Sequence, residues 1–364
     1  MTAHHPLRFR LTTAKTIIFC LAILNALSLA AIYSSLHEGG SFTAQGLFYK
    51  EIVWMIISWL FLLFFSFVNY RIYYDLAYFF YIFNIILLFI VGRFGKTAMG
   101  ATRWINIAGF NFQPSEVAKI AIIFLLARFF SFQGKRGFLK DFLVPLVLVG
   151  FSSLIILKQP DLGTALILIF LFLLTGFASQ VKKRYFVFLL IAGIAAAPFL
   201  FNHLKDYQKK RLIVFVNPNA DPLGAGYTII QSKIAVGSGR FFGKGFLSGT
   251  QNQFNFLPER HTDFIFTVIG EEGGLLGSLF LILIYWLIIN TILKETDRLK
   301  DPFAQYLCFA IATLFFLHLF INVGMTLGIL PVVGVPFLFM SYGGTHLMAS
   351  FILAGIFLNI CHSE

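Results

Sequence analysis

The chain has 364 residues, of which 58% are hydrophobic and only 12% are charged. Soluble globular proteins carry about twice that charged fraction, so this composition excludes an ordinary soluble enzyme. The formal net charge of +12 could suggest a nucleic-acid partner, but the basic residues separate apolar runs and no nucleic-acid-binding motif occurs. We therefore expect a polytopic membrane protein that binds no nucleic acid. Its three cysteines have no metal-ligand spacing, and we expect them to be free thiols: Cys20, Cys308 and Cys361.

The apolar residues divide into ten segments, each near the length of about 20 residues that crosses a bilayer. The first follows a basic N-terminal stretch and is long for a signal-peptide core, so we interpret it as a retained signal anchor. We expect an all-α polytopic membrane fold of ten transmembrane helices, forming one domain over residues 1–364. The expected spans are about 16–36, 52–68, 76–92, 114–130, 142–157, 162–179, 185–203, 263–293, 303–325 and 345–361.

Lys and Arg are unevenly distributed between the short connections. With the N-terminus in the cytoplasm, the inner segments hold 13 of them and the short outer segments 5. Short cytoplasmic loops are the basic ones, and long loops do not count, so we expect both termini in the cytoplasm. The Gly- and Pro-rich residues 204–262 then form the main extracytoplasmic loop, between spans seven and eight, with a short amphipathic helix around 229–236.

The start of the fourth expected span carries two charges. Pro114 suits the first turn of a helix, and Glu116 and Lys119 follow on one face at i, i+3. A lysine one turn inside a membrane helix is costly and is a functional candidate. The alternative is a structural Glu116–Lys119 pair, with Lys119 snorkelling outward.

The start of the eighth expected span carries Asp263, where the helix dipole favours an ionised carboxylate. Such a carboxylate can accept a proton from a hydroxyl or hold a divalent cation. The alternative is simple helix capping by Asp263, or by His261 and Thr262. Glu271 and Glu272 lie about 12 Å further along the axis. Two overlapping G-x-x-x-G patterns around them predict close approach of another helix, and a buried structural network fits Glu272 as well as a catalytic role does.

The last expected outer loop reads GILPVVGVPFLFMSYGGTH, with two prolines and several glycines. We expect a re-entrant-like segment before span ten, which is tolerable at membrane depth only where it lines protein or a wet cavity. Such segments occur in transporters and in enzymes, so this loop does not decide between the two.

Together these features predict an outward-facing cavity with one carboxylate, several cations and apolar walls. Cations suit a phosphate or pyrophosphate, and apolar walls open to lipid suit a polyprenyl tail. The residues alone therefore indicate a lipid-pyrophosphate enzyme or transporter. The expected cations are Lys96, Arg103, Lys119, Lys210, Arg211, Arg240 and Lys244.

Five strings carry a family resemblance: RWINIAGFNFQPSEVAK, KQPDLGTA, YQKKRLIVFVNPNADPLGAGYTIIQSKIAVGSG, GKGFLSGTQNQFNFLPERHTDFIFTVIGEEGG and FMSYGGT. In this order, over nearly the whole chain, they resemble the SEDS family of ten-span peptidoglycan glycosyltransferases, which act in cell shape, elongation, division and sporulation. The GTQ at 249–251 and the short N-terminal tail are more similar to the elongation branch of the family than to its division branch.

The resemblance implies polymerisation of lipid II into glycan strands at the outer face of the cytoplasmic membrane, with a class B penicillin-binding protein as partner transpeptidase. The 4-hydroxyl of an incoming lipid II would displace the lipid pyrophosphate of the growing strand with inversion. Asp263 would be the catalytic residue, as general base or as ligand of a divalent cation (Mg²⁺ or Mn²⁺), without a tightly bound cofactor. The expected substrate-binding residues are Trp104, Glu116, Lys119, Lys96, Arg103, Arg211, Gln231, Lys244, Glu259, His261 and Ser341, with Glu271 and Glu272 near the site.

Two positions depart from the family pattern. Asn111 stands where many relatives have a basic residue, so another cation would bind phosphate there, and Leu338 replaces a usual proline, which should soften that bend. Three alternatives stay open: a lipid II flippase, a non-catalytic scaffold for the transpeptidase, and a division role within the family. A flippase needs a polar path to the cytoplasmic side, whereas the intramembrane charges, Arg128 excepted, gather in the outer half.

Overall fold

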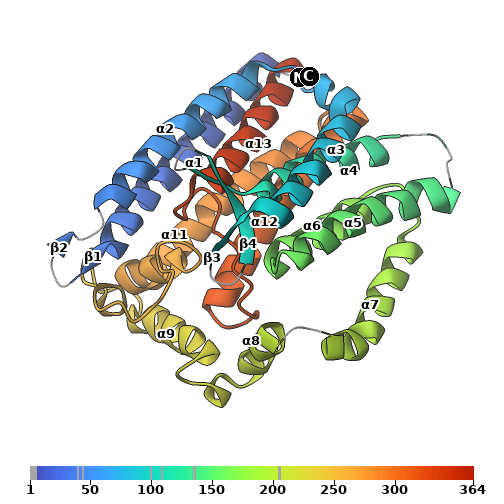
Figure 1. Ribbon diagram of the computed structural model, residues 1–364. Helices are drawn as coiled ribbons and strands as arrows, with labels where there is room; N and C mark the ends of the chain where they lie inside the picture. Colours follow the sequence, from blue (N-terminus) through green and yellow to red (C-terminus); the bar gives the residue numbers. More distant parts are fainter. Residues whose placement is uncertain are drawn as a thin grey trace.

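The computed structural model shows a bundle of long helices (Figure 1). It describes residues 6–38, 41–42, 45–98, 101–107, 110–132, 134, 137–203 and 206–364.

Each of the ten expected apolar segments forms a helix. Within the described residues, seven helices are long and apolar enough to cross a membrane, and α6 is apolar but shorter. The polytopic membrane fold is thus confirmed, whereas the count of ten spans and the single-domain organisation stay predictions. The ten helices are α1 (Pro6–Ser35), α2 (Gln45–Phe67), α3 (Arg71–Phe94), α4 (Pro114–Phe130), α5 (Val144–Lys158), α6 (Leu162–Ala178), α7 (Lys183–His203), α11 (Ile265–Thr296), α12 (Pro302–Thr326) and α13 (Gly344–Ser363).

Helices α4, α12 and α13 form the centre of the bundle, because most of their residues are buried. α13 packs along α2, and α12 packs against α4, α6 and α11. The outer helices α2, α3, α5 and α7 expose many large apolar side chains, which suits contact with lipid tails.

One end of the bundle gathers both ends of the chain (Figure 1). The Thr13 hydroxyl of α1 donates to Glu295 near the end of α11 (2.9 Å). The Tyr70 hydroxyl, between α2 and α3, bonds Asp301 at 3.0 Å and Glu364 at 2.5 Å. α1 therefore begins on the side of the bundle where α13 ends. That this side is cytoplasmic stays a prediction.

Short strands occur in two connections at the opposite end. β1 (His37–Glu38) pairs with β2 (Ser41–Phe42). β4 (Ala101–Ile107) pairs antiparallel with β3 (Lys96–Ala98) and with β5 (Phe110–Phe112). These strands were not predicted, since most are too short to show an alternating pattern.

The described part of the long connection, residues 206–262, contains several short helices. It contains α8 (Asp206–Val216), the 3₁₀ turn η2 (Pro218–Ala220), α9 (Ala225–Ser238) and α10 (Thr250–Gln253). A helix, α9, covers the predicted residues 229–236 and is longer than expected; its amphipathic character stays a prediction. On the other side of the bundle, a π-helical turn η1 (Leu139–Leu143) precedes α5, where Pro145 lacks the N–H that a regular helix would use.

Helix α11 is broken at Gly274, whose φ of 62° and ψ of −157° leave the helical region. The N–H groups of Leu275 and Leu276 donate instead to the carbonyls of Arg240 and Phe241. A Cβ on Gly274 would lie 2.3 Å from Gly243 N, so only glycine allows this contact. The G-x-x-x-G pattern therefore admits a loop at Gly274 rather than another membrane helix.

The other glycines of the pattern differ among themselves. A Cβ on Gly270 would meet Val236 of α9 at 3.1 Å, so the predicted close approach of a helix is correct there. Gly273 has no neighbouring atom within 4 Å of such a Cβ, and close approach is wrong for this position.

Candidate active site

The segment before α11 presents Asp263 at the outer end of the bundle. The residue that caps α11 is Phe264, and no side chain caps this helix, so the interpretation of Asp263 as a helix cap is wrong. In the described part of the chain, no donor reaches the half-buried Asp263 carboxylate, whereas its backbone carbonyl accepts from Asn322 (2.8 Å). The carboxylate is therefore held in place by its backbone and left available to a ligand.

Four charged residues act on this carboxylate. Burial raises the pKa of Asp263 to about 6, and nearby Glu259 and Asp161 raise it too, while Arg103 and Arg211 lower it. A carboxylate with such a pKa is a better proton acceptor than an exposed aspartate and is still mostly ionised at pH 7. The predicted residues Arg103, Arg211, Glu259 and Asp263 thus share one site.

Arg103 reaches the site from β4 and is fixed by the start of α6. Its guanidinium lies 3.8 Å from the Asp161 carboxylate and donates to the carbonyls of Gln159 and Pro160. Asp161 caps α6 by accepting from Thr164 N (3.2 Å) and its hydroxyl (3.0 Å). Asp161 was missed as a site residue. The available signal was an Asp directly before an apolar helix, with Thr three residues later.

The last outer connection lies against the Asp263 segment. Gly334, with a φ of 68°, passes so close that a Cβ on it would lie 3.2 Å from Asp263 Oδ2. The Ser341 hydroxyl donates to the Thr262 carbonyl (2.6 Å), and Tyr342 N donates to the His261 carbonyl (2.9 Å). This irregular segment therefore lines the site, as its prolines and glycines predicted.

Two expectations for this connection need correction. Ser341 is fully buried, and its hydroxyl bonds only backbone groups in the described chain, since it donates to the Thr262 carbonyl and accepts from Phe337 N. Its role is to hold the segment rather than to bind substrate. Leu338 does not soften the bend, because Phe339 follows it with a φ of 62° and the chain still turns sharply.

The polar and charged residues of the stretch FLPERHTD have separate structural roles. Arg260 is buried and donates to the Ser35 carbonyl of α1 at 2.6 Å. Glu259 accepts from the Thr262 hydroxyl (2.8 Å) beside Asp263. His261 packs edge-on against Tyr342, and burial lowers its pKa, so it is neutral at pH 7. Arg260 therefore anchors the segment that carries Asp263 to α1, and Glu259 raises the pKa of the Asp263 carboxyl.

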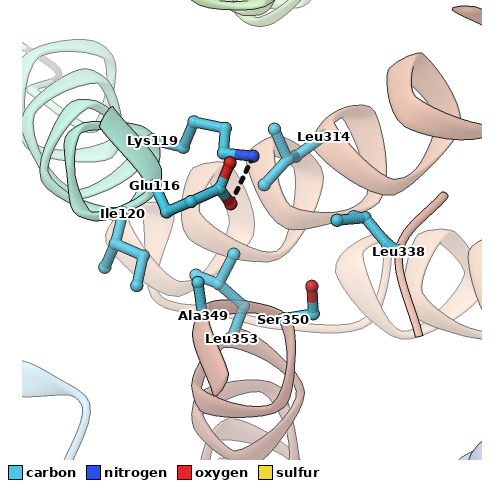
Figure 2. Close-up of a pocket in the computed structure, with 8 residues that line it drawn as sticks. All are labelled: Glu116, Lys119, Ile120, Leu314, Leu338, Ala349, Ser350 and Leu353. Atoms are coloured by element: carbon cyan, nitrogen blue, oxygen red, sulfur yellow. Dashed lines mark ion pairs between the residues drawn. The ribbon is translucent and has the colours of Figure 1, made fainter. Parts of the chain in front are cut away.

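Glu116 and Lys119 form a closed ion pair in the centre of the bundle (Figure 2). Lys119 Nζ lies 2.7 Å from Glu116 Oε2, and each side chain is only 2% exposed. They border a cavity of about 10 Å³, room for about one water, with apolar walls and Ser350. The snorkelling of Lys119 is wrong, and the structure supports the interpretation as a structural pair. The pair does not open into the Asp263 site.

A histidine links this pair to the outer connection. Lys119 Nζ lies 3.0 Å from His318 Nε2, and His318 Nδ1 lies 2.9 Å from the Pro336 carbonyl. Since an ammonium only donates and a carbonyl only accepts, Nε2 accepts and Nδ1–H donates. Lys119 therefore supports the segment beside Asp263 through His318.

Glu271 and Glu272 fasten the long connection between α7 and α11 to α11. The fully buried Glu271 carboxylate accepts from Lys244 Nζ (2.7 Å), Gln251 N (3.1 Å) and Asn252 Nδ2 (3.1 Å). Glu272 accepts from the Ser34 hydroxyl of α1. The GTQ segment at 249–251 is therefore anchored by hydrogen bonds to the Glu271 carboxylate. A structural network is the better interpretation of Glu271 and Glu272 than a catalytic role. Lys244 pairs with Glu271 instead of facing Asp263.

The remaining candidates lie around the outer end. Trp104 is half-buried on β4, and Gln231 is half-buried on α9. Lys96 pairs with Trp104 in the β3–β4 register, but its side chain lies outside the described residues. The described residues contain no cluster of three or more His, Cys, Asp or Glu side chains suited to a metal. A cation at Asp263 would take its other ligands from backbone carbonyls, water or a substrate.

Sequence comparison relates the chain to known proteins. The family described as "Cell cycle protein", of the FtsW, RodA and SpoVE type, matches residues 14–364. Peptidoglycan glycosyltransferase MrdB of Escherichia coli K12 is 43% identical over 291 residues, covering 80% of this chain and 79% of MrdB. The probable peptidoglycan glycosyltransferase FtsW of Geobacter sulfurreducens is 39% identical over 285 residues, covering 77% and 74%.

Structural comparison gives the same result. A chain from the structure described as "Structural coordination of polymerization and crosslinking by a peptidoglycan synthase complex" matches with a TM-score of 0.81 and 27% identity, covering 95% of this chain and 96% of that one. The rod shape determining protein RodA of Thermus thermophilus shares the fold, with a TM-score of 0.71 at 24% identity, covering 95% of both chains. This chain therefore belongs to the FtsW, RodA and SpoVE family of cell cycle proteins, the SEDS family.

Proposed function

We propose that this protein is a peptidoglycan glycosyltransferase of the elongation type, which polymerises lipid II at the outer face of the cytoplasmic membrane. Glycosyltransferase activity is the function named for both curated relatives, and MrdB, at 43% identity, supports the elongation branch. The observation that carries the mechanism is the Asp263 carboxylate, which has no hydrogen-bond donor among the described residues and lies under the influence of two arginines.

Asp263 acts as the general base in this proposal. The 4-hydroxyl of an incoming lipid II gives its proton to the Asp263 carboxylate while its oxygen attacks the anomeric carbon of the growing strand. The bond from that carbon to the lipid pyrophosphate breaks, and the configuration inverts. Burial raises the pKa of Asp263 to about 6, which brings the base closer to the pH at which it works.

Arg103 and Arg211 supply positive charge for the departing pyrophosphate. Both influence Asp263 electrostatically, and both reach the site from outer elements, β4 and α8. Removal of one well-placed donor for developing negative charge costs about 3–4 kcal/mol of transition-state stabilisation in other enzymes. This assignment replaces Lys119 as the cation for pyrophosphate, because Lys119 is enclosed with Glu116 and His318.

A divalent cation is the alternative partner of Asp263. Mg²⁺ commonly binds through one or two carboxylates and substrate phosphates rather than through a complete protein cage. Asp263, with Glu259 beside it, fits such a site, and the cation would supply charge to the pyrophosphate. No tightly bound cofactor is proposed.

The partner is a transpeptidase of the class B penicillin-binding type. The support is the similar structure described as a peptidoglycan synthase complex that coordinates polymerization and crosslinking. The membrane location and the shared side of the two chain ends fit a multi-pass protein of the cytoplasmic membrane with both ends inside.

The rival functions predict different products. We would incubate the purified protein and its partner transpeptidase with labelled lipid II in detergent, where transport across a bilayer does not occur. Long glycan that muramidase digests supports the polymerase, whereas a flippase or a scaffold yields no polymer. A chelator with Mg²⁺ or Mn²⁺ add-back separates the two roles of Asp263: activity that survives the chelator supports direct base catalysis.

A further inference from the structure

Helix α12 carries a polar face directed at the Asp263 site. His318, Asn322 and Thr326 are spaced four residues apart, and each is fully buried in an otherwise apolar helix. Residues at this spacing lie on one face of a helix. Polar groups inside a membrane protein are costly unless they are bonded and are usually functional. None of these three residues was a sequence candidate.

The Asn322 side chain joins two separate segments. Its Nδ2 donates to the Asp263 carbonyl (2.8 Å) and to the Val335 carbonyl (2.8 Å). Of the two ends of the Asn322 amide, only the NH₂ group can donate hydrogen bonds. Because both partners are carbonyls, they determine which end of the amide faces them. Its Oδ1 is buried and has no partner among the described residues, so these two bonds account for its side-chain hydrogen bonding there.

The two carbonyls flank the reacting carboxylate. One carbonyl belongs to Asp263 itself, and the other belongs to Val335. The residue before Val335, Gly334, lies close to the carboxylate, because a Cβ built on it would be 3.2 Å from Asp263 Oδ2. The Asn322 amide therefore joins the Asp263 carbonyl directly to the Val335 carbonyl, whereas the Ser341 and Tyr342 bonds join the neighbouring residues of the same two segments. Asn322 is fully buried, so it does not contact substrate.

We propose that Asn322 is a positioning residue that sets the Asp263 carboxylate against the Val335 segment for glycosyl transfer. This inference rests on the proposed function of Asp263. Displacement of a reacting group by about 1 Å can cost about 100-fold in rate. A positioning role therefore predicts a lower kcat with an almost unchanged KM for lipid II.

Two variants of Asn322 test the role. Asn322→Asp keeps the shape but places oxygen opposite the carbonyls, and Asn322→Leu removes both bonds without adding charge. Thr313→Val is the matched control on α12, because the Thr313 hydroxyl bonds only the Phe309 carbonyl of its own helix among the described residues. We expect kcat for glycan polymerisation to fall about 100-fold in both Asn322 variants, with KM within about threefold and the control unchanged.

A second measurement does not depend on activity. In an Asp263→Cys background, Asn322→Leu should raise the rate of thiol labelling at the introduced cysteine severalfold, since the backbone carbonyl of residue 263 loses its hydrogen bond to Asn322. The native cysteines are buried. Labelling at the rate of the parent would overturn the proposal.

The outcomes separate this inference from the proposed function. Wild-type protein that makes no polymer would contradict the proposed function itself. Wild-type polymer together with an unchanged kcat in a folded Asn322 variant would overturn only the positioning role, as would a loss confined to KM. If Asn322→Asp fails to fold, Asn322→Leu and the labelling rate decide.

Discussion

Replacement of Lys119 by methionine should destabilise the protein strongly. The ammonium lies 2.7 Å from Glu116 Oε2, with both side chains 2% exposed. At an effective dielectric constant of about 20, two unit charges at that distance attract by about 6 kcal/mol. Part of this attraction offsets the free energy of removing both charges from water. Loss of one partner from a buried ion pair costs about 3–5 kcal/mol of stability, because the remaining charge is left without a counter-charge.

The double variant separates structure from chemistry. Lys119→Met with Glu116→Leu removes both charges at similar volume, and replacement of a buried ion pair by hydrophobic residues is often neutral for stability. We therefore expect the double variant to recover most of the lost stability. His318 Nε2 loses its donor in both variants, and a lost hydrogen bond leaves a residual cost of about 1 kcal/mol.

Thermal unfolding in the same detergent measures the effect. At about 2 °C per kcal/mol for a large chain, Lys119→Met should lower the apparent Tm by about 5–10 °C, and the double variant by only a few degrees. A single variant as stable as wild type would refute the structural pair. A double variant that regains stability but makes no glycan would show that Lys119 also acts in catalysis.

Three further predictions concern the outer end of the bundle. Polymerisation should rise with pH through about 6, because the base must be ionised and burial raises the pKa of Asp263 to about 6; a pH–rate profile that is flat around 6 would contradict this. Gly334→Ala should cost about 1–2 kcal/mol of stability and lower kcat, since φ is 68° and the new Cβ meets Asp263 Oδ2 at 3.2 Å; thermal unfolding and polymerisation assays check both effects. Glu271→Gln should speed proteolysis of the connection between α7 and α11, because Lys244 loses its buried counter-charge. The control variant Glu295→Gln, at the opposite end of α11, should not change the rate. Equal cleavage of the wild type and both variants would refute the anchoring role.

The sequence predicted the helices well because the membrane imposes length and hydropathy on each of them. The observed α4, Pro114–Phe130, has the predicted bounds, since a proline marks its first turn. The break in α11 was not predicted. Its cause is pairing with a loop 35 residues earlier, from Leu275 to Arg240, which no local pattern reports.

The candidate site was predicted in part, for a related reason. Asp263 was identified because a charge at the end of a span is conspicuous, and Arg103 because it is one of the cations in the connections expected on the outer side. Local spacing alone could not tell whether Lys119 faces outward or into the core, because that depends on His318 about 200 residues later. Asn322 was missed, although His318 and Asn322 at i, i+4 in an apolar run form a polar face that could have been noticed.

The comparison of wild type with Asp263→Asn tests the central claim most directly. Both proteins would be purified with the partner transpeptidase, checked for equal Tm and partner binding, and supplied with labelled lipid II. We predict long glycan from wild type and none from the variant, because the amide cannot accept the proton of the attacking hydroxyl. Equal polymer from both proteins would contradict the account and remove Asp263 from the centre of the site.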